Sequence, residues 1–220
     1  MGYDMTVLAI DRSTPRGTFA VVCDDEEITF SVFREKAPRS PEWFPTLVAA
    51  LKKCGLAPAA LDAIVIGTGP GSFSGIRAVL AAAQGLALPS DTPVYGVLSS
   101  SALAAAEASR ASASRVAVVG DARRGSLWLA ILDDAAPTPP RLVPYDAAPT
   151  ALEKLADARI VSPDADRVRA ILAQRMERPP EIFEALPTAR DVSAFFAAHP
   201  EAAVRDPTPA YLHPAVDPHK

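Results

Sequence analysis

The stretch Gly67-Thr68-Gly69-Pro70-Gly71-Ser72-Phe73-Ser74-Gly75-Ile76-Arg77 decides how this chain is interpreted. An apolar run precedes it and a long segment rich in alanine and leucine follows it, an order that predicts strand, glycine loop and helix. The glycines and the proline let the backbone turn tightly and approach another group closely. Such a loop serves either a phosphate group or the backbone of another protein, and these alternatives imply different functions.

A second pattern occurs twice. The strand 6–10 is followed by Asp11, a turn that carries arginine and ends at Gly17, and another strand. The strand 115–119 is followed in the same way by Asp121, Arg123, Arg124 and Gly125, and then by the strand 126–132. This repetition predicts an internal duplication of an α/β unit, with a first lobe over residues 1–110 and a smaller, proline-rich second lobe with a C-terminal tail over residues 111–220.

Helical patterns connect these strands. In the first lobe we expect helices at 41–54, capped by Ser40, at 73–88, and at 101–110. The second lobe has weaker signals, and we expect helices at 150–157, 164–175 and 191–198.

The composition restricts the function. With 220 residues, a net charge of −4 and a pI of about 5.4, the chain has no overall electrostatic reason to hold nucleic acid by itself. It contains no apolar run long enough to cross a bilayer, its N-terminus does not resemble a secretory signal, and Cys23 and Cys54 are not spaced like a metal or redox site. We therefore expect a cytoplasmic protein without membrane association.

Three motifs resemble one known family. They are Leu8-Ala9-Ile10-Asp11 with Ser13-Thr14, the glycine loop with Gln84-Gly85-Leu86-Ala87, and Asp121-Ala122-Arg123-Arg124-Gly125. In this order they resemble the actin, sugar-kinase and heat-shock ATPase (ASKHA) superfamily and, more closely, its TsaB (YeaZ) family. The resemblance implies a two-lobed, actin-like, ribonuclease H-like α/β fold.

The same resemblance implies a function. TsaB proteins belong to the bacterial machinery that makes threonylcarbamoyladenosine on tRNA, and they are not its catalyst. They pair with the homologous subunit TsaD, which holds the metal and performs the transfer, and the ATPase TsaE joins that pair. The family implies no cofactor for this chain, tRNA contact only within the complex, and a homodimer as an alternative state when the chain is alone.

Catalytic equipment is difficult to find in the residues themselves. The histidines are His199, His213 and His219, and no HxxxH pair on a helix exists, so we predict no catalytic or metal-binding residue. Ser72 and Ser74 invite a nucleophile interpretation, but no histidine is placed by a local pattern to activate them. Loop hydrogen bonds and a helix N-cap are the simpler roles for these serines.

The phosphate alternative depends on the end of the first strand. An Asp at this position helps to position magnesium in ATP-using relatives, so Asp11, Ser13, Gly69 and Gly71 are candidates for a vestigial anion or nucleotide cleft. In the competing interpretation Asp11 forms a turn and is hydrogen-bonded to its own hairpin, and we favour this one.

The partner alternative depends on the helix after the loop. Gly75, Ala78, Ala82 and Gly85 form one stripe of small residues, so another helix could approach closely, although the lobe's own helices could also cover it. The resemblance favours an intermolecular helix bundle. The predicted interface residues are Trp43, Phe44, Leu47, Gly75, Ala78, Val79, Ala82 and Gln84.

Two charged positions remain. Arg123 and Arg124 are either solvated or paired with Asp11, Asp121 or an anion, and the resemblance places Asp121, Arg123 and Arg124 near the inter-lobe or complex surface. The sequence as a whole predicts a non-catalytic dimerisation and scaffold subunit for tRNA modification. The alternative is an ATP-dependent phosphotransferase of the sugar-kinase type or a peptidase-like hydrolase.

Overall fold

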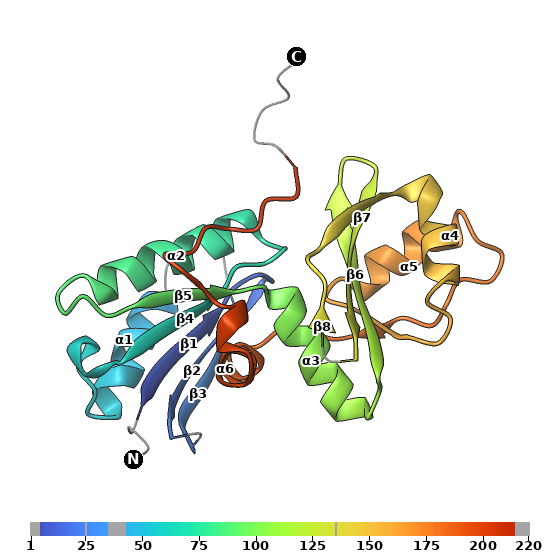
Figure 1. Ribbon diagram of the computed structural model, residues 1–220. Coiled ribbons are helices and arrows are strands. Elements are labelled where there is room, and N and C mark those ends of the chain that lie inside the picture. Colours follow the sequence, from blue (N-terminus) through green and yellow to red (C-terminus); the bar gives the residue numbers. More distant parts are fainter. Residues whose placement is uncertain (1–4, 25, 35–42, 135, 214–220) are drawn as a thin grey trace. The chain divides into compact units, whose positions relative to one another are not determined.

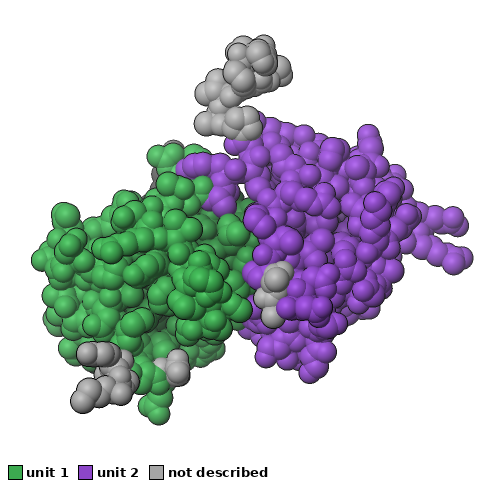
Figure 2. Space-filling view, viewed as in Figure 1, with its two compact units in different colours: residues 1–102, 187–209 green, residues 103–186, 210–220 purple. Residues whose placement is uncertain are grey.

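The computed structural model describes residues 5–24, 26–34, 43–134 and 136–213 (Figure 1). The chain divides into two compact units, which Figure 2 distinguishes by colour. The first contains Met1–Ala102 and Pro187–Pro209, and the second contains Leu103–Leu186 and Ala210–Lys220. The predicted Ser40 cap and the start of its helix lie outside the described residues.

The first unit is built on a mixed sheet of six strands. Its order is β12-β5-β4-β1-β2-β3, with β1 parallel to β4 and antiparallel to β2. β1 and β4 are apolar and almost entirely buried, as expected of strands that are covered on both faces. The strands are β1 (Thr6–Asp11), β2 (Arg16–Cys23), β3 (Glu26–Arg34), β4 (Ala63–Gly67), β5 (Val94–Val97) and β12 (Val204–Arg205).

Helices cover both faces of this sheet. α1 (Trp43–Lys53) and α2 (Phe73–Ala87) share one core with alternate residues of β1 and β2, such as Leu8 and Phe19. The intervening residues, including Ala9 and Ala20, face the opposite way, where α6 (Ala189–Ala198) packs on β1, β2 and β4.

The second unit repeats the strand order of the first. Its sheet runs β11-β10-β6-β7-β8, with β9 also paired to β7, and β10 is parallel to β6 as β4 is to β1. The strands are β6 (Arg115–Arg123), β7 (Ser126–Asp133), β8 (Ala136–Pro137), β9 (Arg141–Pro144), β10 (Arg159–Ser162) and β11 (Phe183–Glu184). The helices are α3 (Ser99–Ala111), α4 (Ala148–Glu153) and α5 (Ala165–Ala173). The repeated order confirms the internal duplication inferred from the two hairpins.

Two helices pack on the sheet of a unit other than the one whose strand precedes them in the chain. α3 follows β5 of the first unit, but its residues Leu103 and Ala104 pack with Val116 and Val118 of the second unit's sheet. α6 follows β11 of the second unit but covers the first unit's sheet. The division therefore differs from the expected boundary at residue 110, because residues 103–110 belong to the second unit and residues 187–209 belong to the first.

Candidate functional site

The glycine loop packs against the β1–β2 turn of its own unit. A Cβ atom at Gly71 would lie 2.0 Å from the carbonyl oxygen of Ser13, and one at Gly75 would lie 2.2 Å from that of Arg12. The Ser72 N–H donates to the Ser13 carbonyl at 2.7 Å. These glycines therefore make room for the backbone of the same chain, a role outside the two alternatives drawn from the sequence.

Ser72 also caps α2. Its hydroxyl oxygen accepts a hydrogen bond from the Gly75 N–H at 3.2 Å. This is the N-cap role expected for a serine at this position.

Asp11 is the centre of a buried polar network at the end of β1. Its Oδ1 accepts hydrogen bonds from the N–H and the hydroxyl of Ser13, at 2.9 and 2.7 Å, and its Oδ2 accepts one from the Ser99 hydroxyl at 2.6 Å. The Ser99 oxygen in turn accepts from the Gly69 N–H at 3.0 Å. The network ties β1 to the glycine loop and to the start of α3.

The Asp11 network leaves no room for an added side chain. Asp11 is fully buried, and a Cβ atom at Gly67 would lie 1.9 Å from its Oδ2. Burial raises the pKa of Asp11 above its ordinary value, while the hydrogen bonds from Ser99 and Ser13 act in the opposite direction.

The four candidate cleft residues Asp11, Ser13, Gly69 and Gly71 thus lie together, but each is engaged with its own chain. This geometry fits the interpretation of Asp11 as a residue bonded to its own hairpin. An anion cleft at these residues stays a prediction.

Ser99 is the network residue that the sequence analysis missed. The strand order of the structure explains its position, because β5, β4 and β1 are neighbours and the residues that follow parallel strands gather at one edge of the sheet; the sequence alone does not give this order.

The predicted interface residues fall into two groups. Trp43, Leu47, Gly75 and Val79 are buried within the first unit, and the guanidinium of Arg12 lies 5.3 Å from the Trp43 ring centre. For these four positions the structure supports the alternative in which the unit's own elements cover α2, because the apolar stripes of α1 and α2 face their own sheet. The other four are exposed or half-buried: Phe44, Ala78, Ala82 and Gln84.

α2 nevertheless exposes a continuous surface, which we call the α2 ridge. It begins at Phe73, which is 57% exposed and lies under the Arg77 guanidinium, and ends at Leu88, which is 83% exposed. A Cβ atom at Gly85 would meet no atom within 4 Å. The α2 ridge consists of Phe73, Arg77, Ala81, Gln84, Gly85 and Leu88.

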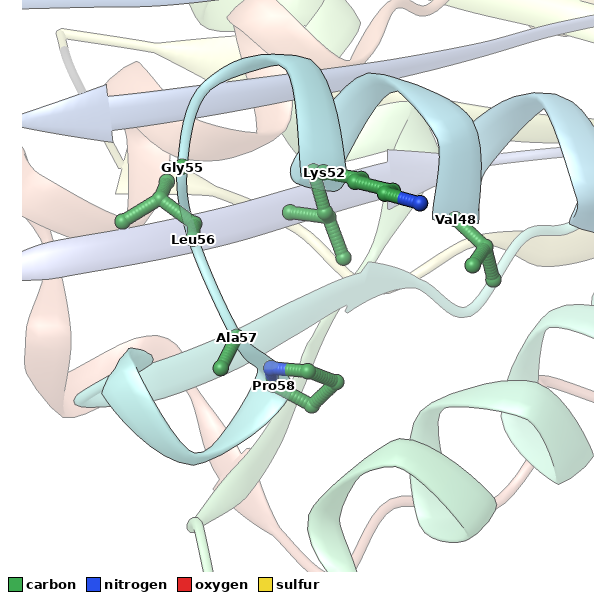
Figure 3. Close-up of a pocket in the computed structure, with 7 residues that line it drawn as sticks. Val48, Lys52, Gly55, Leu56, Ala57 and Pro58 are labelled. Atoms are coloured by element: carbon green, nitrogen blue, oxygen red, sulfur yellow. The ribbon is translucent and has the colours of Figure 1, made fainter.

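An apolar hollow lies beside the exposed side of α1 (Figure 3). Lys52 is the one charged residue in its lining, and Val48, 43% exposed, forms part of its wall. A hollow of this composition suits contact with an apolar group and provides no acid–base pair. The lining residues are Val48, Leu51, Lys52, Gly55, Leu56, Ala57 and Pro58.

Asp121 occupies in the second unit the position that Asp11 occupies in the first. Its Oδ1 accepts from the Arg123 N–H at 2.8 Å and from the Tyr145 hydroxyl at 2.7 Å. Its Oδ2 pairs with Arg123 Nη1 at 3.1 Å and with Arg167 Nε at 3.3 Å. Of the pairings left open by the sequence, the one between Arg123 and Asp121 is present, and Arg167 is a partner that the sequence did not indicate.

The remaining candidates give little further chemistry. Arg124 is exposed. His213 Nε2 lies 2.9 Å from the Ala122 carbonyl oxygen, and His199 pairs with Glu201, while His219 lies outside the described residues. In the part of the chain that the structure describes, no three His, Cys, Asp or Glu side chains are grouped to hold a metal ion, and no helix is long and apolar enough to span a membrane.

Two units that share the order of five strands, each opened by a hairpin with an Asp at or near the end of its first strand, define a duplicated actin-like (ASKHA, ribonuclease H-like) α/β protein. The family model described as TsaD, tRNA N6-adenosine threonylcarbamoyltransferase, matches residues 40–168. The chain belongs to this family, and its relatives place it with the TsaB (YeaZ) proteins, as its motifs indicated.

Sequence relatives carry the TsaB name. The tRNA threonylcarbamoyladenosine biosynthesis protein TsaB of Bacillus subtilis is 34% identical over 124 residues, 56% of this chain and 53% of that protein. TsaB of Escherichia coli is 33% identical over 128 residues, 57% and 54% of the two chains. The chain thus spans about half the length of the curated relatives that it matches.

A solved structure extends the similarity to nearly the whole chain. YeaZ from Pseudomonas aeruginosa superposes with a TM-score of 0.70 at 26% identity, covering 94% of this chain and all of that one. A second Pseudomonas aeruginosa structure, described as similar to peptidase YEAZ, gives a TM-score of 0.74 at 26% identity and covers 95% of this chain and 100% of that one.

Proposed function

We propose that this chain is a non-catalytic subunit in the synthesis of threonylcarbamoyladenosine on tRNA. It pairs with and stabilises a TsaD-like catalytic homologue, and a TsaE-like ATPase joins the pair. It works in the cytoplasm, needs no cofactor of its own and meets tRNA within the assembly. The names of its relatives and the family model support this role.

The observation that carries the non-catalytic part is the state of Asp11. In ATP-using relatives of this superfamily, an Asp at this position helps to position magnesium. Here three donors from Ser13 and Ser99 engage it, and it is fully buried. Its chemistry is thus used to hold the fold together.

The α2 ridge supports the pairing. A glycine inside an exposed helix costs about 0.5–1 kcal/mol relative to alanine. No atom of the described chain approaches the place where a Gly85 Cβ would lie, so packing within the chain does not account for this glycine. Close approach by a helix of another subunit does.

A charge on the ridge tests the pairing. Ala81 is exposed on α2, so Ala81→Arg should leave the chain folded and abolish its co-elution with the TsaD-type homologue from the same cell. Ala194→Arg is the matched control, because Ala194 is also exposed in a helix of the first unit, on α6. Ala81 is preferable to the half-buried Ala82, which packs against the core.

The outcomes separate the parts of the proposal. If the parent chain does not pair with the homologue, and tRNA from cells depleted of this chain keeps its threonylcarbamoyladenosine, the proposed function is wrong. If the parent pairs and both variants still pair, the α2 ridge is not the contact. Micromolar ATP binding with turnover by the isolated chain, measured by calorimetry with magnesium, would favour the phosphotransferase alternative.

A further inference from the structure

Three arginines gather at the β6–β7 turn of the second unit. Arg123 is the last residue of β6, Arg124 follows it in the turn, and Arg167 reaches Asp121 from α5. The side chains of Arg123 and Arg167 are 61% and 51% exposed, and Arg124 is exposed as well. We call this group the arginine corner.

A buried carboxylate holds two of these guanidinium groups in place. The Asp121 side chain is only 4% exposed, and its single atom Oδ2 lies 3.1 Å from Arg123 Nη1 and 3.3 Å from Arg167 Nε. Since both groups meet the same oxygen, they lie side by side. Each guanidinium has five N–H donors, so most of their donors stay available to another anion.

The backbone at Arg123 and Arg124 adopts a conformation that is unfavourable for arginine. Arg123 and Arg124 have φ angles of 64° and 48°, a left-handed conformation that glycine or asparagine adopts more easily. The hydrogen bond from the Arg123 N–H to Asp121 Oδ1 helps to hold it. Strained residues of this kind are concentrated at functional sites.

The other acids near the corner have partners of their own. Asp164 accepts hydrogen bonds from the Asp121 N–H and the Ser162 hydroxyl, and Asp166 pairs with Arg169. Asp121 is thus the carboxylate that the arginines of the corner share. The corner therefore retains the capacity to bind an anion.

We propose that the arginine corner binds the phosphodiester backbone of RNA, which rests on the proposed role in tRNA modification. Guanidinium groups match phosphate geometry and bind it in a bidentate manner. The side chains of the corner are open to solvent instead of enclosed, and an open surface suits successive phosphates of a polymer better than a small nucleotide, which needs a concave site. The chain's net charge of −4 restricts this contact to an assembly that adds further contacts.

The salt dependence of tRNA binding tests this proposal. The chain is assembled with its TsaD-type homologue, and tRNA affinity is measured by fluorescence anisotropy between about 50 and 200 mM salt. Arg123→Gln and Arg167→Gln should each weaken binding and lower the slope of log K against log salt by about 0.7–0.9, since each removes one phosphate contact. A purely structural role would not change this slope.

Arg169→Gln is the matched control. Arg169 lies on α5 like Arg167, has a similarly exposed side chain at 47%, and pairs with Asp166. Arg169→Gln removes one positive charge from the same helix as Arg167→Gln and should leave the slope of log K against log salt unchanged. Thermal unfolding of each variant checks that the second unit is intact.

Each result has a distinct meaning. An unchanged slope in Arg123→Gln and Arg167→Gln, with the assembly intact, would overturn the RNA contact and leave the proposed function standing. Equal changes of the salt slope in all three variants would mean that the corner acts only as general surface charge, and this result would also overturn the proposed RNA contact. Loss of mononucleotide binding with unchanged tRNA binding would assign the corner to a small ligand. Failure to assemble at all would count against the proposed function itself.

Discussion

Asp11 ends the first strand of one hairpin and Asp121 lies two residues before the end of the first strand of the equivalent hairpin, but the two carboxylates are satisfied in different ways. Asp11 is fully buried and accepts hydrogen bonds from the neutral groups of Ser13 and Ser99. Asp121 accepts from Tyr145 and pairs with Arg123 and Arg167, whose side chains are largely open to solvent.

The difference shows how a duplicated element acquires separate roles. A carboxylate inside the protein whose acceptor positions are taken by neutral donors of the same chain is not available to a ligand. A buried carboxylate that holds exposed arginines keeps the spare donors of those arginines available for binding. In the first unit the Asp organises the fold, and in the second it organises a charged surface.

The largest expected effect comes from removing the first carboxylate. Asp11→Ala leaves the hydroxyls of Ser13 and Ser99 without their acceptor in a buried site, so the free energy of unfolding should fall by about 2–4 kcal/mol. Urea unfolding followed by circular dichroism measures this loss. A loss below about 1 kcal/mol would mean that the network relaxes easily and that the contrast between the two sites is weaker than the geometry indicates.

The equivalent change in the second unit should cost less. Asp121→Ala removes the acceptor of the Tyr145 hydroxyl and of the Arg123 N–H, but it releases the side chains of Arg123 and Arg167, which are more than half exposed and can be solvated, so we expect a loss of about 1–2 kcal/mol. The same urea experiment compares the two variants directly. Equal losses for Asp11→Ala and Asp121→Ala would contradict the distinction between a core network and a surface one.

The two sites also differ in how far the sequence could predict them. The strand that leads to each Asp, the glycine loop and the α2 helix could be predicted, because apolar runs and glycines act locally. The bond between Asp11 and Ser99 could not, because it joins residues 88 positions apart and depends on the order of strands in the sheet. The pairing of Asp121 with Arg167 could not be predicted for the same reason, because the two residues lie far apart in the sequence and on different elements.

The sequence also could not show that α6 belongs to the first unit, for a different reason. Its apolar residues, such as Val192 and Phe195, indicate that one face of the helix is buried. They do not indicate which of two similar sheets covers that face. The duplication that made the fold recognisable therefore also made the boundary between its units hard to locate.

A pH series sharpens the comparison at Asp11. Because burial raises its pKa in the folded state, the folded chain keeps this proton over a pH range in which the unfolded chain has lost it. Asp11 thus reduces stability as the pH rises from about 4 through its folded pKa. Asn cannot ionise, so the stability deficit of Asp11→Asn relative to the parent should be largest at low pH and should shrink as the pH rises.

Urea unfolding of both proteins at several pH values between about 4 and 7 gives this difference. Titrating groups that do not interact with Asp11, such as Glu27, whose pKa the hydrogen bond from Arg190 lowers, are common to both proteins and cancel. Asp191, whose charge also raises the pKa of Asp11, contributes to the measured difference. A deficit that grows with pH would show that the hydrogen bonds from Ser99 and Ser13 outweigh burial.

The smallest expected effect tests the cost of the arginine corner. Arg124 has a φ of 48° beside Gly125 in the two-residue turn between β6 and β7, where Asn-Gly is the favoured sequence. Arg124→Asn should therefore raise the free energy of unfolding by about 0.5 kcal/mol, because asparagine tolerates the left-handed conformation. Arg124→Ala, which removes the same charge without that tolerance, should give no such gain. A gain in stability in both variants would attribute the effect to the lost charge. A gain in Arg124→Asn alone would mean that the second hairpin, unlike the first, gives up stability to keep an arginine exposed at its turn.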